Sequence, residues 1–174
     1  AADFAVPPQA VVSRFDSRFP EFRGSTVLDL GCGAGDVTAR FALAHPACRI
    51  VGVDAGPRML AAARDHLAAL GIADRVELLE RHLPDPRLAD HGPFCAVISN
   101  SLLHHLADPR TMWSSVRRGR PGAAVLVQDL RRPEDESTLT ALVDAHTVGA
   151  APALVEDFRH SLRPAYTVAE VEEQ

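Results

Sequence analysis

The sequence lacks the features that mark several large classes of protein. No uncharged apolar run approaches the ~20 residues that a membrane-spanning helix needs, and we expect no signal peptide, because the first residues show no basic region followed by an apolar stretch. Positive charge is not in excess either: 18 Lys and Arg stand against 23 Asp and Glu, a net charge of −5. We therefore predict neither a membrane nor a nucleic-acid partner.

Cysteine is scarce, and its placement excludes two further classes. Cys32, Cys48 and Cys95 are an odd number without the spacing of a disulfide scaffold. They form no CxxC pair, and His104 and His105 are adjacent rather than one helical turn apart, so we expect no metal site. Free thiols are typical of a reducing compartment, which predicts the cytoplasm.

What is present is the composition of an ordinary globular domain. The chain has 174 residues, of which 47% are hydrophobic and 24% charged. A length in this range favours one domain. An amphipathic pattern built on Val11, Phe15 and Phe19 precedes the first apolar run. We therefore divide the chain into an N-terminal helical cap, residues 1–22, and a main domain, residues 23–174.

Short apolar runs alternate with amphipathic helical patterns along the main domain. The runs are apolar on both faces, which is typical of parallel strands covered on two sides. They are Val27–Leu30, Arg49–Val53, Arg75–Leu79, Ala96–Ile98 and Ala123–Val127. Helical patterns begin between them, at Asp36, at Gly56–Pro57 and at Asp108–Pro109. This alternation predicts an open, doubly wound α/β sheet with right-handed crossovers.

A glycine-rich loop follows the first predicted strand. Residues 31–36 read Gly-Cys-Gly-Ala-Gly-Asp, and glycines at this place let a ligand approach the backbone and the N-terminus of the next helix. The dinucleotide fingerprint requires glycine where Asp36 stands, and a carboxylate there would repel a pyrophosphate. A nicotinamide-dependent oxidoreductase is therefore a disfavoured alternative. The acids Asp29 and Asp36 suit a nucleoside that lacks phosphates and carries a cationic amine.

The segment Val27–Gly35 resembles the first motif of the class I S-adenosylmethionine (SAM)-dependent methyltransferases. The resemblance extends from Phe22 to Leu130. It implies a Rossmann-like parallel sheet with strand order 3-2-1-4-5 and helices on both faces. It also implies SAM as the cofactor, S-adenosylhomocysteine (SAH) as its product, and a small-molecule methyl acceptor. A methyltransferase-like subunit that binds SAM without catalysis, and serves a partner, is the alternative.

The resemblance assigns residues to the cofactor. Asp54 matches the acid that accepts both ribose hydroxyls, and an acid at the end of this strand reads a ribose diol in dinucleotide folds too. Met59 would pack on the adenine, and Asp29 would meet the amino group of the cofactor. The full set of predicted cofactor-binding residues is Asp29, Gly31, Cys32, Gly33, Gly35, Asp54, Ala55, Met59, His82, Leu83, Ser99 and Asn100.

Two positions depart from the family pattern. After the third strand the family commonly has an acid that accepts a hydrogen bond from the adenine amino group, but here Arg81 and His82 stand nearest. A neutral His82 can accept that bond, and the backbone N–H of Leu83 can contact the ring. Before the fourth strand Phe94–Cys95 stands where the family often has Phe-Asp, an acid that is usually structural.

His104 and His105 are the candidates for a catalytic role. They follow the fourth predicted strand, where the acceptor would lie. An unperturbed imidazole titrates near pH ~6.5, which suits a general base. Adjacent helical residues face different directions, so we expect one of the two near the methyl group. In-line methyl transfer does not itself require an acid–base pair.

The residues after Leu130 contain no apolar pattern long enough for a strand. Thr167–Glu170 has the sequence of a capping box and lies close to Gln174, which suggests a truncated C-terminus. We therefore predict five strands and none beyond residue 131. The open edge of the fifth strand would be covered by the helical region Ser137–Val148, or paired with another molecule in a homo-oligomer.

Overall fold

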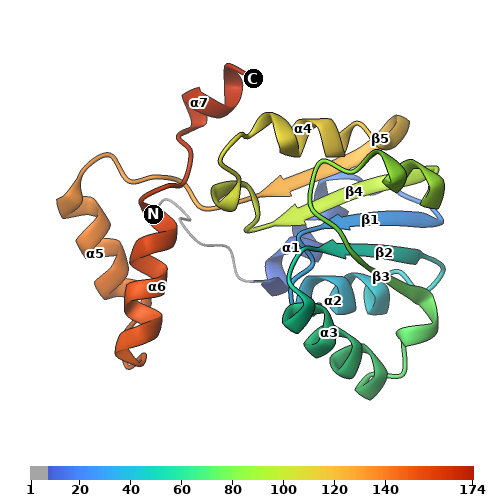
Figure 1. Cartoon of the computed structure of the whole chain (residues 1–174), viewed down its shortest axis with the longest axis horizontal. Helices are drawn as coiled ribbons and strands as arrows, with labels where there is room; N and C mark the ends of the chain where they lie inside the picture. The colour runs from blue at the N-terminus through green and yellow to red at the C-terminus, as the bar shows by residue number, and fades with distance from the viewer. Residues whose placement is uncertain (1–7) are drawn as a thin grey trace.

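Five parallel strands form a single sheet in the computed structural model, which describes residues 8–174. The strand order is β3-β2-β1-β4-β5 (Figure 1). The strands are β1 Thr26–Leu30, β2 Arg49–Asp54, β3 Val76–Glu80, β4 Phe94–Asn100 and β5 Gly119–Gln128. Every pairing is parallel. The predicted doubly wound α/β fold and its strand order are confirmed.

Helices cover both faces of the sheet, because both faces of each inner strand are apolar. Val27 of β1 belongs to a buried cluster with α1, α2 and α3, whereas Leu28 belongs to a cluster on the other face with α4. Successive side chains of a strand point to opposite faces, so a continuous apolar run needs two layers of cover. These helices are α1 Pro8–Arg18, α2 Asp36–Ala44, α3 Pro57–Ala69 and α4 Arg110–Val116.

Helix α1 packs on α2 through an aromatic cluster. The ring of Phe15 lies 5.0 Å from those of Phe19 and Phe22 and 4.9 Å from that of Phe41. Such ring pairs add stabilisation of about 0.5–1.5 kcal/mol each beyond the burial of their area. Residues 1–7 of the expected N-terminal cap lie outside the described residues. The domain boundary between residues 22 and 23 stays a prediction. Phe15, on the N-terminal side of that boundary, is buried in the same cluster as residues of β1 and α2.

The third and fifth strands begin at other residues than the sequence predicts. Arg75 ends a short 3₁₀ turn, η1 Ala73–Arg75, instead of beginning the third strand. The fifth strand begins at Gly119, before the predicted run Ala123–Val127, and contains a bulge: Phe94 pairs with Gly119 and Ala96 with Ala124. The left-handed conformation of Gly122 permits the bulge.

The chain after β5 forms no further strand up to Gln174, as predicted. It forms α5 Glu136–His146, α6 Pro152–Leu162 and α7 Val168–Glu172. Both hydrogen bonds of the predicted capping box are present at the start of α7. None of the described helices is long and apolar enough to cross a membrane.

The expectation that residues 137–148 cover the edge of β5 is wrong. Helix α5 instead packs against α6, and the two share the buried residues Leu139, Val143 and Leu162. Figure 1 shows this helical hairpin beyond the carboxyl ends of the strands, away from β5. The reason is that α6, which we did not predict, supplies the apolar partner that the buried face of α5 needs.

Candidate functional site

A cavity of about 620 Å³ opens at the carboxyl ends of the strands. Its walls come from the segments that follow β1, β2, β3 and β4. Ligands of open α/β sheets bind at this edge, beside the point where the strand order reverses. The volume lies within the range of about 300–1,000 Å³ that is typical of small-molecule sites.

The glycine loop forms the floor of the cavity. Gly31 and Gly33 have φ values of 71° and 52°, a conformation that side chains disfavour. A Cβ on Gly31 would meet the side chain of Leu102 at 2.9 Å, whereas a Cβ on Gly33 would meet nothing within 4 Å. Gly33 therefore leaves open space in which a ligand can touch the backbone. The loop leads directly into the N-terminus of α2.

Asp54 ties this loop to the end of β2. One carboxylate oxygen accepts a hydrogen bond from the backbone N–H of Gly33 at 2.9 Å, and the other accepts from Gly56 at 2.8 Å. Each oxygen of a carboxylate has more than one acceptor position, and Asp54 lines the cavity. It can therefore also accept two hydrogen bonds from the neighbouring hydroxyls of a diol.

Asp29 is a buried carboxyl group at the same edge. Its side chain accepts a hydrogen bond from the Thr38 hydroxyl at 2.6 Å. Burial raises the pKa of Asp29 to about 6, the Thr38 hydrogen bond opposes this rise, and the charge of Asp54 adds to it. A cationic ligand group beside Asp29 would stabilise its ionised form.

Apolar and basic side chains also line the cavity. Met59 is 52% exposed although it is apolar, and it borders the cavity together with Ala55 and Leu83. Arg81 and His82 line the same cavity. A flexible, exposed methionine on a cavity wall suits an aromatic ring as its partner.

The histidine pair is divided between the cavity and the core. His105 lines the cavity, whereas His104 is buried and its Nδ1 lies 2.6 Å from an Asp129 carboxylate oxygen. Asp129 also accepts backbone hydrogen bonds from Leu103 and Leu130. The two imidazole rings are 4.0 Å apart.

The environment of His105 favours its neutral form. Burial lowers the pKa of His105, and His104 lowers it further, against the opposing charges of Asp129 and Asp54. A neutral imidazole at the edge of a cavity can accept a proton. His105, rather than His104, is therefore the candidate that can reach a bound molecule directly.

Most of the predicted site residues lie together on the cavity. The predicted residues that line it are Asp29, Gly31, Cys32, Gly33, Asp54, Ala55, Met59, His82, Leu83, Asn100 and His105. Gly35 instead precedes α2 with φ 81° and faces Ala63. Ser99 is buried, and its hydroxyl donates to the Leu30 carbonyl at 2.9 Å. Roles for Gly35 and Ser99 in cofactor binding stay predictions.

Sequence reasoning missed several residues of the site. Leu102 and Leu106 form apolar wall, and Ser101 borders the cavity with φ 59°, which is unusual for a residue other than glycine. The sequence contains one feature that could have identified Asp129 as a site residue: it directly follows the last strand, at the carboxyl edge of the sheet.

Within residues 8–174 there is no group of three or more His, Cys, Asp and Glu residues that could hold a metal ion.

The family of the chain follows from comparison with known proteins. The sequence model of a family described as "Methyltransferase domain" matches residues 27–121, the segment that carries most of the cavity. The chain belongs to this family. It is a methyltransferase domain, and the cofactor that membership implies is SAM.

Two groups of curated relatives are similar over most of the chain. The ubiquinone/menaquinone biosynthesis C-methyltransferase UbiE of Klebsiella pneumoniae is 32% identical over 135 residues, which are 77% of this chain and 53% of that protein. The ubiquinone biosynthesis O-methyltransferase of Pseudomonas paraeruginosa is 30% identical over 145 residues, 81% of this chain and 60% of that protein. The chain thus spans between half and two thirds of the length of these relatives.

Solved structures share the fold at lower identity. The plantazolicin methyltransferase BpumL, in complex with a monoazolic desmethylPZN analog and SAH, has a TM-score of 0.69 at 13% identity, over 95% of this chain and 59% of that one. The glycopeptide N-methyltransferase MtfA has a TM-score of 0.60 at 24% identity, over 76% of this chain and 57% of that one. These likenesses support the Rossmann-like fold.

The residues of the cavity fit SAM. The open space above Gly33 admits a ligand against the backbone, Asp54 offers two acceptor oxygens to a ribose diol, and the buried carboxyl of Asp29 suits the cationic amine. The exposed Met59 suits the adenine. Acidic side chains in a cavity of about 620 Å³ suit a nucleoside that carries a cationic group rather than phosphates.

Proposed function

We propose that this domain transfers the methyl group of SAM to a hydroxyl group of a small aromatic molecule held beside His105. The observation that carries the proposal is that one cavity contains the glycine loop, the Asp54 carboxylate and the His105 imidazole. When bound, SAM would supply an electrophilic methyl group, whose carbon bonds to the attacking nucleophile as its bond to sulfur breaks and SAH leaves.

The side chains of the chain bind and orient the two molecules. Asp54 and the backbone of Gly33 hold the ribose, and ionised Asp29 pairs with the ammonium group. Leu102 and Leu106 make the wall on the side of His105 apolar. An apolar wall suits an aromatic ring and excludes water from the reacting atoms.

His105 would accept the proton of the attacking hydroxyl. Its lowered pKa leaves it neutral at pH 7 and therefore able to act as a base. Asp129 fixes the orientation of His104, whose ring packs on that of His105. Relatives named as an O-methyltransferase and a C-methyltransferase of ubiquinone biosynthesis support an oxygen-bearing aromatic ring as the acceptor class.

The rival dinucleotide function is disfavoured by the cavity itself. Asp36 lines the cavity at the start of α2, where an oxidoreductase of this fold would place the pyrophosphate.

The three cysteines are free thiols, and we place the domain in the cytoplasm, a reducing compartment.

Two measurements on the full chain test the proposed function. Calorimetry should show one SAH bound per chain, and NADH should not displace it. Incubation with methyl-labelled SAM and a panel of catechols should transfer label to a hydroxyl oxygen, and His105→Ala should slow the transfer by about 10²-fold or more, the usual size of a general-base contribution.

The possible outcomes separate the alternatives. Failure to bind SAH contradicts the proposal. Binding of SAH without transfer to any hydroxylated ring supports the alternative of a SAM-binding subunit without catalysis. His104→Ala is the matched comparison, because His104 does not line the cavity; equal kinetic losses in both variants would contradict the assignment of the base to His105.

A further inference from the structure

A series of hydrogen bonds links helix α1 to the cavity that His105 lines. The Arg14 guanidinium donates to the side-chain carbonyl of Gln128 at 3.3 Å, and the Gln128 amide donates to the side-chain carbonyl of Asn100 at 2.9 Å. The Asn100 amide then donates to the hydroxyl oxygen of Ser101 at 3.2 Å. Asn100 and Ser101 line the cavity, whereas Arg14 and Gln128 do not. The series therefore begins outside the cavity and ends in its wall.

The arginine at the start fixes the direction of every bond in the series. A guanidinium has N–H donors and no acceptor, so Gln128 must turn its carbonyl oxygen to Arg14 and its NH₂ group to Asn100. Asn100 must then turn its own carbonyl oxygen to Gln128, which directs its NH₂ group to Ser101. Gln128 is buried, and reversing its amide would leave two donors facing each other without water to separate them.

Gln128 also fixes the backbone of Ser101. Its main-chain carbonyl accepts a hydrogen bond from the Ser101 N–H at 2.9 Å, and Ser101 has a φ of 59°. The Ser101 hydroxyl oxygen accepts from Asn100, and within residues 8–174 the hydroxyl hydrogen has no acceptor of its own. This O–H group, with the second N–H of the Asn100 amide, is therefore available to a molecule in the cavity.

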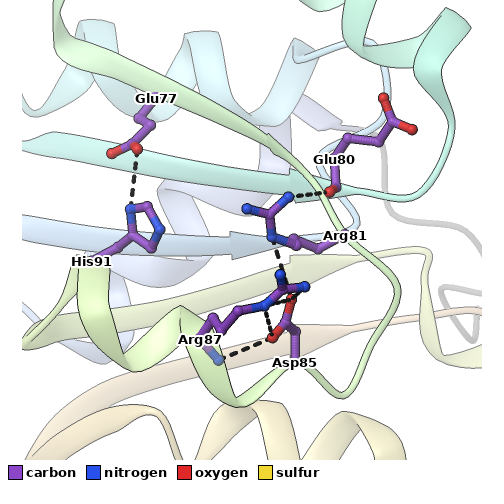
Figure 2. A network of polar contacts seen from close by, with 6 residues as sticks. All are labelled: Glu77, Glu80, Arg81, Asp85, Arg87 and His91. Carbon is purple, nitrogen blue, oxygen red and sulfur yellow. Dashed lines mark hydrogen bonds and ion pairs between the residues drawn. The ribbon is translucent and has the colours of Figure 1, made fainter.

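The arginine that lines the cavity is engaged on the other side of the site. Arg81 follows β3, and β2 and β1 separate that strand from β4. Its guanidinium donates to the backbone carbonyl of Glu80 at 2.8 Å and lies 3.3 Å from a carboxylate oxygen of Asp85 (Figure 2). Arg81 therefore does not compete with the end of β4 for a group bound beside His105.

Donors in an apolar wall select the part of a ligand that faces them. Leu102 and Leu106 supply apolar wall from the same segment as Ser101. An ether or carbonyl oxygen satisfies such donors, whereas an apolar group leaves them desolvated without a partner. A site of this kind discriminates against an analogue that lacks the oxygen.

We propose that Asn100 and Ser101 donate hydrogen bonds to a second oxygen of the methyl acceptor, on the ring carbon next to the hydroxyl that is methylated. The inference rests on the proposed function, because it takes a phenol to lie beside His105. Asn100 and Ser101 are specificity-determining residues, and Gln128 and Arg14 position them. The sequence-based expectation that Asn100 contacts the cofactor is the rival assignment of these donors.

Two phenols of the same shape test the proposal on the full chain saturated with SAH. 2-Methoxyphenol carries an ether oxygen beside its hydroxyl, and 2-ethylphenol has a CH₂ group in place of that oxygen. We expect the wild-type protein to bind 2-methoxyphenol about tenfold more tightly, the effect of one or two hydrogen bonds. Titrations followed by NMR measure the two dissociation constants.

Gln128→Glu should reverse the polarity of the series while keeping its shape. A carboxylate only accepts hydrogen bonds, so Asn100 must turn its NH₂ group to the new side chain and its carbonyl oxygen toward Ser101. An ether oxygen in the cavity would then face an acceptor, and 2-ethylphenol should become the tighter ligand.

Ser101→Gly tests the end of the series without straining the backbone, because glycine accommodates the φ of 59°. It removes one of the two donors and leaves Asn100 in place. The preference for 2-methoxyphenol should fall to about threefold or less. This variant decides the question by itself if circular dichroism shows that Gln128→Glu is unfolded.

Gln174→Glu is the matched control. Gln174 accepts a hydrogen bond from the Trp113 indole at 2.8 Å and does not line the cavity. The same change of charge at this position should leave the ratio of the two dissociation constants at its wild-type value. The affinity for SAH, measured in every variant, reports separately on the cofactor.

The remaining outcomes each overturn a distinct claim. Equal binding of the two phenols by the wild-type protein overturns the inference and leaves the proposed function standing. A preference that is unchanged in both Gln128→Glu and Ser101→Gly does the same. Loss of SAH affinity in Gln128→Glu, with an unchanged phenol ratio, assigns the donors to the cofactor and overturns the inference. Failure of the wild-type protein to bind SAH, or to bind either phenol in the presence of SAH, contradicts the proposed function itself.

Discussion

Asp29 is a carboxyl group that the fold keeps away from water at the cofactor end of β1. Its pKa of about 6 means that the folded protein holds this proton more tightly than the unfolded chain does, whose value is 3.8. The stability that comes from neutral Asp29 is therefore fully present below about pH 4, and it is lost as the pH rises through about 6.

This protonation predicts that cofactor binding depends on pH. The ammonium group of SAM or SAH favours ionised Asp29, so we expect affinity for SAH to rise between about pH 5 and pH 7. Protons should be released on binding near pH 6, where Asp29 of the free protein is half protonated. Calorimetry in two buffers of different ionisation enthalpy measures the release.

Two variants test the assignment to Asp29. Asp29→Asn should abolish both the proton release and the pH dependence. Asp36→Asn is the control, because Asp36 is partly exposed and pairs with Arg40; it should keep both. Proton release that persists in Asp29→Asn would assign the titration to another group of the cavity.

Asp54 combines a structural and a binding role in one carboxylate. Its loss removes the acceptor for the N–H groups of Gly33 and Gly56 as well as the proposed partner of the ribose hydroxyls. We expect Asp54→Ala to weaken SAH binding by about tenfold or more, because a hydrogen bond to a charged group contributes about 1.5–3 kcal/mol.

The measurement is a titration of SAH by calorimetry, with thermal unfolding of the free protein beside it. Glu80→Gln is the matched control: Glu80 ends the adjacent strand but does not line the cavity. An unchanged dissociation constant in Asp54→Ala would remove the ribose assignment.

At the scale of elements, the α5–α6 hairpin has a core of its own. Leu162 is fully buried there against Leu139 and Val143. We expect Leu162→Ala to destabilise the hairpin by about 2–5 kcal/mol, the usual cost of emptying such a site. Hydrogen exchange should speed up in residues 136–162 and remain slow in β1 and β2.

The position of the hairpin gives this variant a second readout. No residue of α5 or α6 lines the cavity, so the affinity for SAH should stay the same in Leu162→Ala. Leu154→Ala, at a side chain of α6 that is 60% exposed, should change neither property. A loss of SAH affinity in Leu162→Ala would show that the hairpin supports the cofactor site.

At the scale of the whole molecule, the outer edge of β5 has no strand beside it within residues 8–174. An uncovered edge strand offers unpaired backbone groups to another chain. Val125 of this strand is 37% exposed. We therefore expect the protein to associate as its concentration rises, which light scattering coupled to gel filtration measures.

Val125→Lys should reduce this association, because a charged side chain on an edge strand opposes pairing. Leu43→Lys is the control: Leu43 is 54% exposed on α2, away from the edge. A molar mass of one chain at every concentration would contradict association through β5.

The sheet and much of the cavity follow from local features of the sequence. Strand pattern, glycine loop and the acid at Asp54 are local features, because the loop and the acid directly follow the strands that carry them. All strands of a parallel sheet end at one edge, so residues at successive strand ends must meet there. Local order along the chain is therefore enough to bring Gly33 and Asp54 together.

Other features depend on contacts between segments that are distant in the sequence. Asp129 contacts His104 because β4 and β5 are neighbours in the sheet. Of the two adjacent histidines, His105 and not His104 lines the cavity. Arg81 lines the cavity and forms an ion pair with Asp85. Helix α5 packs against α6 and does not cover the edge of β5. These outcomes depend on which apolar and charged partners compete for each side chain, and that competition is settled only when the elements pack.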